Sequence, residues 1–297
     1  MTNFEIPDVA RDLIDFFFDE QEQELIAGYG GKVISDADFP ETFLEQEYHR
    51  GVISKTNETG RTYVLNNFYG FLDVFCVSRQ EEYGQLTPLQ KKALDDWYFE
   101  AYFQSLDTSR SHPTDDRVIP LDELIREIEA DPRPLYLNYC DCRSLTGNCG
   151  FPTRTCITYK NGINSFADRG LSEPIDKEQA IKILRETDKA GLMHTTMGQS
   201  ICNCCTDCCY LFRSQKRLNS YGGWPKADYI ISIEEELCIG CARCVTRCQL
   251  GVFRRDQGKR VLMNNEKCAG CGICVRTCPK HALRLLARNS GAEDIPE

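Results

Sequence analysis

Eight cysteines near the C-terminal end of the chain repeat one spacing twice, and that spacing suits the ligation of iron. Each run reads C-x2-C-x2-C-x3-C, which is typical of ligands to a [4Fe-4S] cube. The first run comprises Cys238, Cys241, Cys244 and Cys248. The second comprises Cys268, Cys271, Cys274 and Cys278. Thiolates this close in sequence reach several irons of one cube when the backbone turns tightly, so the repeat predicts two clusters.

The fourth cysteine of such a run normally ligates the other cluster of the pair. We therefore predict that the ligands of cluster 1 are Cys238, Cys241, Cys244 and Cys278. Those of cluster 2 are then Cys268, Cys271, Cys274 and Cys248. The tight turns are permitted by Gly240, Gly270 and Gly272, because glycine adopts positive φ without steric cost. Paired C-x2-C motifs also serve zinc, but two identical four-cysteine runs favour iron–sulfur clusters.

The two runs end differently. The second is followed by Pro279, as this pattern prefers, whereas the first is followed by Gln249, which removes a rigid turn but no ligand. Residues 230–288 resemble the two-cluster bacterial ferredoxins. The resemblance implies a C-terminal domain that accepts and donates single electrons.

Nine further cysteines lie on both sides of one predicted helix. The first four are Cys140, Cys142, Cys149 and Cys156, and the other five are Cys202, Cys204, Cys205, Cys208 and Cys209. Asp176 and Gln179 form a predicted capping box at the start of the helix, and Gly191 is its predicted C-cap. The remaining cysteine, Cys76, is predicted to be a buried apolar thiol.

Three arrangements of the nine central cysteines remain open. The first is two more cubes, one on Cys140, Cys142, Cys149 and Cys156 and one on four of the five cysteines at 202–209. The second is one cluster drawn from both groups, plus a zinc ion. The third is one active-site cluster with free thiols. Neighbours such as Cys204 and Cys205 point apart in an extended chain, so they need not share a cluster. His194 is either a ligand or a nearby hydrogen-bond donor that tunes a cluster.

Three motifs of this central region resemble those of an uncharacterised group of 4Fe-4S-binding proteins. They are CDCR at 140–143, GLMH at 191–194 and CNCCTDCC at 202–209. In that group the motifs precede a ferredoxin domain, and a winged-helix-like N-terminal part and a segment like 118–120 also recur. The resemblance covers most of the chain and implies a redox function without naming a substrate.

The composition indicates a compartment in which thiols bind metals. The chain has 297 residues and 18 cysteines. Its acidic start lacks the basic and apolar regions of a signal peptide, and no apolar stretch is long enough to span a membrane. We therefore expect a cytoplasmic protein, in which disulfides are disfavoured.

Charge is unevenly distributed along the chain. Residues 1–139 hold 12 basic and 28 acidic side chains, a net charge of −16, and residues 140–237 hold 12 of each. Residues 238–297 hold 11 basic and 5 acidic side chains, a net charge of +6. Cations near the anionic clusters would favour their reduced state. The acidic N-terminal part argues against DNA binding, which requires neutralisation of phosphates.

Local patterns predict the elements of the first half of the chain. We expect helices at 8–18 and 40–50, a loop without nucleotide-binding function at 27–32, and a hairpin around 57–61, which together suggest a winged helix. Thr87 and Pro88 begin a helix that reaches about Leu106. A further helix at 121–130 and a strand at 135–139 lead to the central cysteines.

The predicted fold class is α+β, with a winged-helix-like N-terminal part, a helical cysteine-rich middle and a C-terminal bacterial 2[4Fe-4S] ferredoxin-like domain. The corresponding segments are an acidic domain at 1–106, a linker and short helix at 107–134, a metal-binding module at 135–229 and the ferredoxin-like domain at 230–297. Two [4Fe-4S] clusters are expected and up to four are possible, with zinc an option in the central module.

The leading functional hypothesis is an electron-transfer protein or redox-enzyme subunit of anaerobic metabolism. It would carry electrons through several [4Fe-4S] clusters to or from a partner oxidoreductase. One alternative is a reductase with a catalytic iron–sulfur site in the central module, and another is an iron–sulfur redox-sensing regulator. No catalytic residue is predicted, because the four histidines are scattered and no proton-transfer group stands out.

Overall fold

The computed structural model describes residues 4–258 and 260–288. The chain divides into two compact units, each assembled from three stretches of sequence. Unit 1 takes residues up to 104, then 136–154 and 159–174; unit 2 takes 105–135, 155–158 and residues from 175 onward. Each unit collects segments from more than one of the domains expected from the sequence, whose boundaries stay a prediction.

Unit 1 is mainly helical. Its helices are η1 (Asp8–Leu13), α1 (Ile14–Phe17), α2 (Glu20–Tyr29), α3 (Glu41–Arg50), α4 (Phe68–Ser78), α5 (Gln80–Gly84), α6 (Pro88–Ser105) and α8 (Asp141–Thr146). Its strands are β1 (Val33–Ser35), β2 (Ile53–Lys55), β3 (Thr62–Leu65), β5 (Leu135–Tyr139) and β7 (Glu173–Ile175). The first three strands form an antiparallel sheet in the order β1-β3-β2.

Most of the local predictions for unit 1 are confirmed. Helix α3 ends at Gly51, which adopts φ of 86° as a left-handed cap, and β2 and β3 form the expected hairpin. Helix α6 begins after Thr87, whose Oγ1 accepts from the Gln90 amide. The segment at 8–18 is helical, but its first half is a 3₁₀ helix. The loop expected at 27–32 begins later, because α2 continues to Tyr29.

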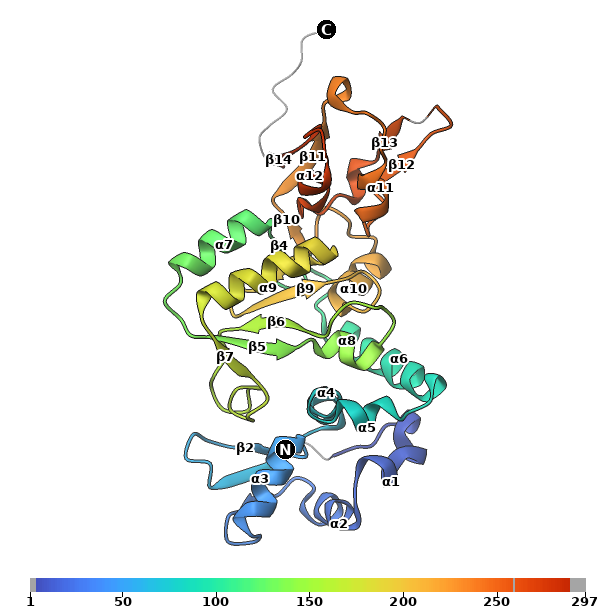
Figure 1. The fold of residues 1–297 in the computed structure, drawn as a ribbon. Coiled ribbons are helices and arrows are strands. Elements are labelled where there is room, and N and C mark those ends of the chain that lie inside the picture. The colour runs from blue at the N-terminus through green and yellow to red at the C-terminus, as the bar shows by residue number, and fades with distance from the viewer. Residues whose placement is uncertain (1–3, 259, 289–297) are drawn as a thin grey trace. The chain divides into compact units, whose positions relative to one another are not determined.

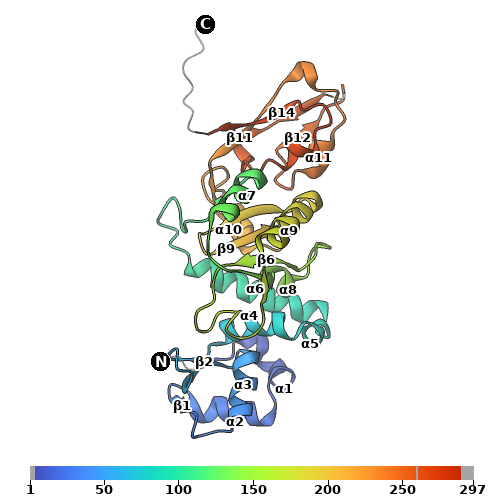
Figure 2. The ribbon, with the colours of Figure 1, turned by 60° about the vertical axis from the view of Figure 1, so that its left-hand side comes forward.

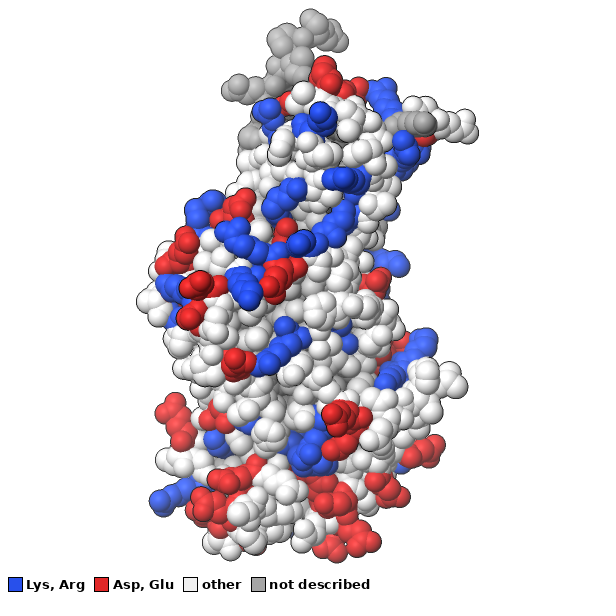
Figure 3. All heavy atoms as spheres, in the orientation of Figure 1, with Lys and Arg blue, Asp and Glu red and all other residues white. Residues whose placement is uncertain are grey.

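The core of unit 1 is rich in aromatic side chains. Helix α4 buries Phe68, Phe71 and Phe75, and each packs edge-to-face on Phe17 with ring centroids 5.2 to 5.8 Å apart. Such pairs add to the hydrophobic stabilisation that ring burial provides. Figure 3 shows acidic side chains gathered over the N-terminal elements of this unit.

Glu47 is a buried carboxyl of unit 1 whose ionisation makes stability depend on pH. Its side chain on α3 is fully buried. Burial raises the pKa of Glu47 to about 9, aided by a hydrogen bond with Glu22 and by the charge of that residue. The folded protein keeps a proton that the unfolded chain releases above about pH 4.3, so stability falls as the pH rises from there toward 9.

We expect Glu47→Gln to remove this pH dependence, because the amide does not ionise. The variant should be more stable than the parent protein at pH 8, by on the order of a few kcal/mol, and nearly equal to it at pH 4.5. Denaturant unfolding at both pH values, on protein prepared without oxygen, measures the difference. The control is Glu45→Gln on the exposed side of the same helix. A loss of stability at pH 8 in Glu47→Gln would contradict the argument.

Unit 2 begins with a sheet and its helices. Its elements before the C-terminal region are β4 (Arg117–Val118), α7 (Leu121–Ala130), β6 (Arg154–Thr158), α9 (Lys177–Ala190), β8 (Met193–Thr196), β9 (Ser200–Cys204), α10 (Tyr210–Leu218) and β10 (Lys226–Ala227). Five of these strands are neighbours in the order β10-β4-β8-β9-β6. The middle of the chain is therefore a mixture of strands and helices rather than the helical module expected from the sequence.

Helix α9 lies beside this sheet and carries the predicted caps. Asp176 and Gln179 form the capping box, and Gly191 ends the helix with φ of 106°. Its buried stripe includes Ala180 and Leu184, and the helix packs against α7 and β8 (Figures 1 and 2). The helix predicted at 121–130 is confirmed as α7.

The C-terminal region of unit 2 is an internal repeat. Its first half contains β11 (Tyr229–Ile233), η2 (Glu235–Leu237), α11 (Arg243–Arg247) and β12 (Phe253–Arg255). Its second half contains β13 (Val261–Met263), η3 (Asn265–Lys267), α12 (Ile273–Thr277) and β14 (Leu283–Ala287). The halves interlock, since β11 pairs with β14 and β12 pairs with β13, both antiparallel. Within the described residues, no helix is both long and apolar enough to cross a membrane.

Candidate metal centres

The two cysteine runs lie on equivalent loops of this repeat, 30 residues apart. In each loop the backbone turns twice through the left-handed region, at Gly240 and Ala242 in the first half and at Gly270 and Gly272 in the second. The φ values are 64° and 60°, then 68° and 76°. These turns curl the loop so that its cysteines surround one space, and Ala242 shows that the conformation is kept even without glycine.

The structure brings together the four cysteines predicted for cluster 1. Cys238, Cys241 and Cys244 from the first run and Cys278 from the second line one cavity. Pro279 also lines it, directly after Cys278. Thiols of both runs therefore line the same space.

A second cavity brings together the four cysteines predicted for cluster 2. It is lined by Cys268, Cys271 and Cys274 from the second run and by Cys248 from the first. Apolar groups such as Ile231 and Phe253 complete its wall, and they belong to the core of the repeat. Gly191 at the end of α9 and Met193 on β8 line it as well.

Burial keeps several of these thiols protonated in the absence of metal. It raises the pKa of Cys244 to about 11 and that of Cys271 to about 12. It also raises the pKa of Cys248 and Cys274. Thiolates are the form that binds metal, so cluster assembly must displace these protons.

The two cysteine cavities differ in their exposure. In the first, Cys241 is exposed and the neighbouring Ile239 has 61 % of its surface accessible. In the second, Cys268 and Cys274 are only 4 % and 7 % exposed. Cluster 1 would thus lie near solvent and cluster 2 deeper, and exposure is one of the factors that set a cluster's potential.

Two arginines of the repeat are held by the C-terminal end of α9. Arg247 donates to the carbonyls of Asp188, Lys189 and Ala190, and Arg276 makes a double ion pair with the Asp188 carboxylate. Cations suit a helix C-terminus because its free carbonyls carry partial negative charge. These contacts fix the repeat to α9 and use part of the positive charge that the sequence suggested for tuning the clusters.

Gln249 is a second link between the repeat and the sheet. Its Nε2 donates to the Gly191 carbonyl, and its Oε1 accepts from the Thr206 amide at 2.9 Å. It directly follows Cys248, and Thr206 directly follows Cys205. Gln249 thus joins the two cysteine-rich regions, whereas the sequence alone indicated only a missing proline.

Strand β9 determines which way the central cysteines point. Side chains alternate along a strand, so Cys202 and Cys204 share one face and Asn203 lies on the other. The fully buried Asn203 side chain accepts from Thr187 Oγ1 at 3.0 Å and bonds to His194 Nδ1 at 2.6 Å. His194 is its direct partner on β8. His194 therefore lies on the face of the sheet opposite Cys202 and Cys204.

Cys204 is the centre of a close group of thiols. Its Sγ lies 3.4 Å from that of Cys209, the N-cap residue of α10, and it shares a hydrogen bond with Cys202. These two hydrogen bonds, together with burial, raise the pKa of Cys204 well above its usual range. Thr195 Oγ1 lies 3.5 Å from the same sulfur.

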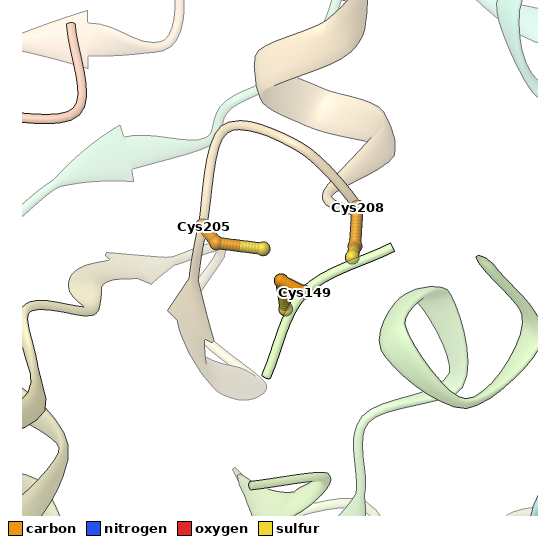
Figure 4. Close-up of side chains that lie close together, drawn as sticks. All are labelled: Cys149, Cys205 and Cys208. Atoms are coloured by element: carbon orange, nitrogen blue, oxygen red, sulfur yellow. The ribbon is translucent and has the colours of Figure 1, made fainter. Parts of the chain in front are cut away.

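Cys205 and Cys208 turn away from this group. Their sulfur atoms and that of Cys149 all lie within 4.8 Å of one another (Figure 4). The expectation that Cys204 and Cys205 point apart is thus confirmed, and the pair Cys208 and Cys209 divides in the same way. In unit 1, Cys140, Asp141 and Cys142 form another group whose ligand atoms lie within 4.8 Å.

The central cysteines come from several elements. Cys140 and Cys142 lie with Asp141, and Cys156 belongs to strand β6. Which of them share a cluster stays a prediction. The acidic Asp141 was not foreseen as a candidate ligand. Cys76 is buried, as predicted, and its thiol donates a hydrogen bond to the Asp73 carbonyl.

Comparison with known families supports the reading of the C-terminal region. A family model described as a 4Fe-4S dicluster domain matches residues 231–285, which contain both cysteine runs. No curated protein and no solved structure matches the chain. The matched region and the many cysteines point to iron–sulfur electron transfer, with at least one [4Fe-4S] cluster. The resemblance to the uncharacterised group stays a prediction.

Proposed function

We propose that this protein carries single electrons through two [4Fe-4S] clusters of its C-terminal region, to or from a partner oxidoreductase. The observation that carries the proposal is the pair of cavities, each lined by three cysteines of one run and the last cysteine of the other. This crossing is the ligand arrangement of two-cluster ferredoxins. The dicluster family match over residues 231–285 supports the same conclusion.

The surroundings of the two cavities suggest a direction for the electrons. Cluster 1 would meet an external redox partner, because Cys241 is exposed and the apolar side chains of Leu237 and Ile239 are 43 % and 61 % accessible beside it. Cluster 2 would serve the central cysteines, because Gln249 links Cys248 to Thr206 beside Cys205. Electrons would pass between partner and central module by way of both clusters.

The N-terminal part would serve as a docking element. The three-stranded sheet β1-β3-β2, with α2 and α3 beside it, supports a winged-helix-like arrangement. Its acidic charge disfavours a nucleic-acid ligand, since DNA binding relies on basic side chains that neutralise phosphates. A basic surface on a partner protein fits this charge better.

Iron and sulfide counting on protein purified without oxygen tests the proposed electron transfer. We expect at least about eight irons and eight sulfides per chain, since each cube holds four of each. Dithionite reduction should produce the EPR signal of two neighbouring reduced clusters and bleach the visible absorption. Restoration of the absorption by an electron acceptor then shows reversible transfer.

A matched variant makes the test specific. Ile239→Asp changes the exposed apolar side chain beside cluster 1 without touching a ligand. It should leave the iron content unchanged while it slows electron exchange with the partner found by copurification. A purified parent protein that holds zinc instead of iron, without visible absorption, would contradict the proposal.

A further inference from the structure

Cys204 and Cys209 are a pair of thiols in direct contact. Cys204 ends strand β9, Cys209 is the N-cap residue of α10, and their Sγ atoms lie 3.4 Å apart. A turn at 206–208 folds the chain back between them. Both side chains are buried. The sulfurs of a disulfide are about 2.05 Å apart, so a small rotation of the two side chains brings these sulfurs to bonding distance.

The pair differs from the groups of side chains that could hold a metal ion. In the part of the chain that the structure describes, the sets of three ligand atoms within 4.8 Å of one another include neither Cys204 nor Cys209. Two thiols in contact differ from a disulfide by two electrons and two protons. Where the surroundings keep thiols reduced, a disulfide is usually transient and takes part in redox chemistry.

The pair lies beside the cavity predicted for cluster 2. Met193 on β8 is the direct partner of Cys204 on β9, so their side chains share a face of the sheet. Met193 also lines that cavity. A second connection starts from the turn between the two thiols, where the Thr206 amide donates to Gln249, the residue after Cys248. Both routes are short, and all of these residues belong to unit 2.

We propose that Cys204 and Cys209 form a dithiol/disulfide couple that exchanges two electrons with the two [4Fe-4S] clusters. This inference rests on the proposed electron transfer. In the reducing direction each cluster gives one electron, the S–S bond breaks and each sulfur takes up one proton. In the oxidising direction the two thiols lose two protons, the S–S bond forms and each cluster accepts one electron. Two one-electron carriers thus match one two-electron couple.

The couple would convert single electrons into a pair. Electrons that enter one at a time through cluster 1 would collect at the two sulfurs, together with two protons. Thr195 Oγ1 lies 3.5 Å from Cys204 Sγ, where its hydroxyl can hydrogen-bond to the thiolate that forms as the S–S bond breaks. The class of reaction that such a couple serves consumes two electrons and two protons together, as the reduction of a disulfide does.

Reductive titration of the full-length protein, prepared without oxygen, tests the couple. Protein first oxidised with the dye thionine should take up about two electrons per chain more than the clusters seen by EPR account for. Mass spectrometry after alkylation should show Cys204 linked to Cys209 in the oxidised protein, and both thiols alkylated after dithionite reduction. Two free thiols in an oxidised protein with intact clusters would overturn the proposal.

A variant without cluster 2 tests the route of the electrons. Cys248→Ser/Cys274→Ser removes two cysteines that line the cavity beside the pair. After oxidation, this variant should keep the disulfide when dithionite is added, because the electrons lack their path to the sulfurs. Reduction of the disulfide as fast as in the parent protein would show that the couple does not exchange electrons with cluster 2.

Single substitutions then locate the couple. Cys209→Ser places a preferred N-cap residue at the start of α10, so the helix should be retained. This variant, and independently Cys204→Ser, should lose the two additional electrons and keep the iron and sulfide content. The control Cys76→Ser, at a buried thiol outside the pair, should keep both. A loss of about four irons in Cys209→Ser would show that Cys209 is a cluster ligand and overturn the proposal.

The outcome is separable from that of the proposed electron transfer. Failure of the couple leaves the iron count and the reducible EPR signals of the parent protein intact. Failure of the electron-transfer proposal removes those signals, whether or not mass spectrometry finds Cys204 linked to Cys209.

Discussion

Loss of Cys248 and Cys274 together should remove only one of the two C-terminal clusters, although the residues belong to different runs. Both line the second cavity, so the variant Cys248→Ser/Cys274→Ser should lose about four irons. By contrast, Cys248→Ser/Cys244→Ser removes two cysteines of the same run that line different cavities. That variant should lose about eight irons. Iron and sulfide analysis, with EPR of the reduced proteins, measures both.

Comparing the two double variants tests whether each cluster takes ligands from both cysteine runs. Each variant lacks two cysteines, so a general weakening of the domain affects both alike. If each run instead held its own cluster, the result would reverse, with about eight irons lost from the first variant and about four from the second. Equal losses in the two variants would also contradict the crossed arrangement. The single variant Cys76→Ser serves as the control for removal of a buried thiol outside the repeat.

The C-terminal region could be predicted from sequence because its ligands are close together along the chain. The spacing within each run and the positive φ at Gly240 and Gly270 are local properties, which a short stretch of backbone determines. The same holds for the caps at Asp176 and Gly191, where one turn of helix decides the conformation. The family match covers this same region and no more of the chain.

The grouping of the central cysteines could not be predicted in this way, because it depends on strand register. Cys156 and Cys202 are 46 residues apart in sequence, and only the pairing of β6 with β9 makes them neighbours. A shift of one residue would turn Cys156 to the other face of the sheet.

Gln249 and His194 show that the contacts of side chains outside the ligand set could not be predicted from the sequence either. From the sequence, Gln249 was only a departure from the usual proline, yet its amide bonds both Gly191 and Thr206. His194 stands three residues after Gly191 in the GLMH motif and lies on β8, the strand directly before the cysteines of β9. Its bond to Asn203 assigns it to the opposite face of β9, where it can orient the strand but not bind beside Cys204.

We expect Gly270→Ala to prevent assembly of cluster 2. Gly270 lies between Cys268 and Cys271 and has φ of 68°. A Cβ at this position would lie 2.4 Å from the backbone oxygen of Tyr229 on β11, which cannot move without breaking the pairing of β11 with β14. The loop must shift instead, and its cysteines with it. Iron analysis should show a loss of about four irons, with cluster 1 retained.

Gly251→Ala is the matched control, because it separates backbone strain from the steric clash. Gly251 has a similar φ of 66°, but an added Cβ there meets no atom within 4 Å. The Gly251→Ala variant should lose only about 1–2 kcal/mol of stability, because alanine disfavours the left-handed backbone conformation. It should keep the full iron content. Similar iron contents in the two variants would show that the approach of Gly270 to Tyr229 is unimportant. A large loss in Gly270→Ala alone would show that strand β11 holds the cysteine loop in its ligating conformation.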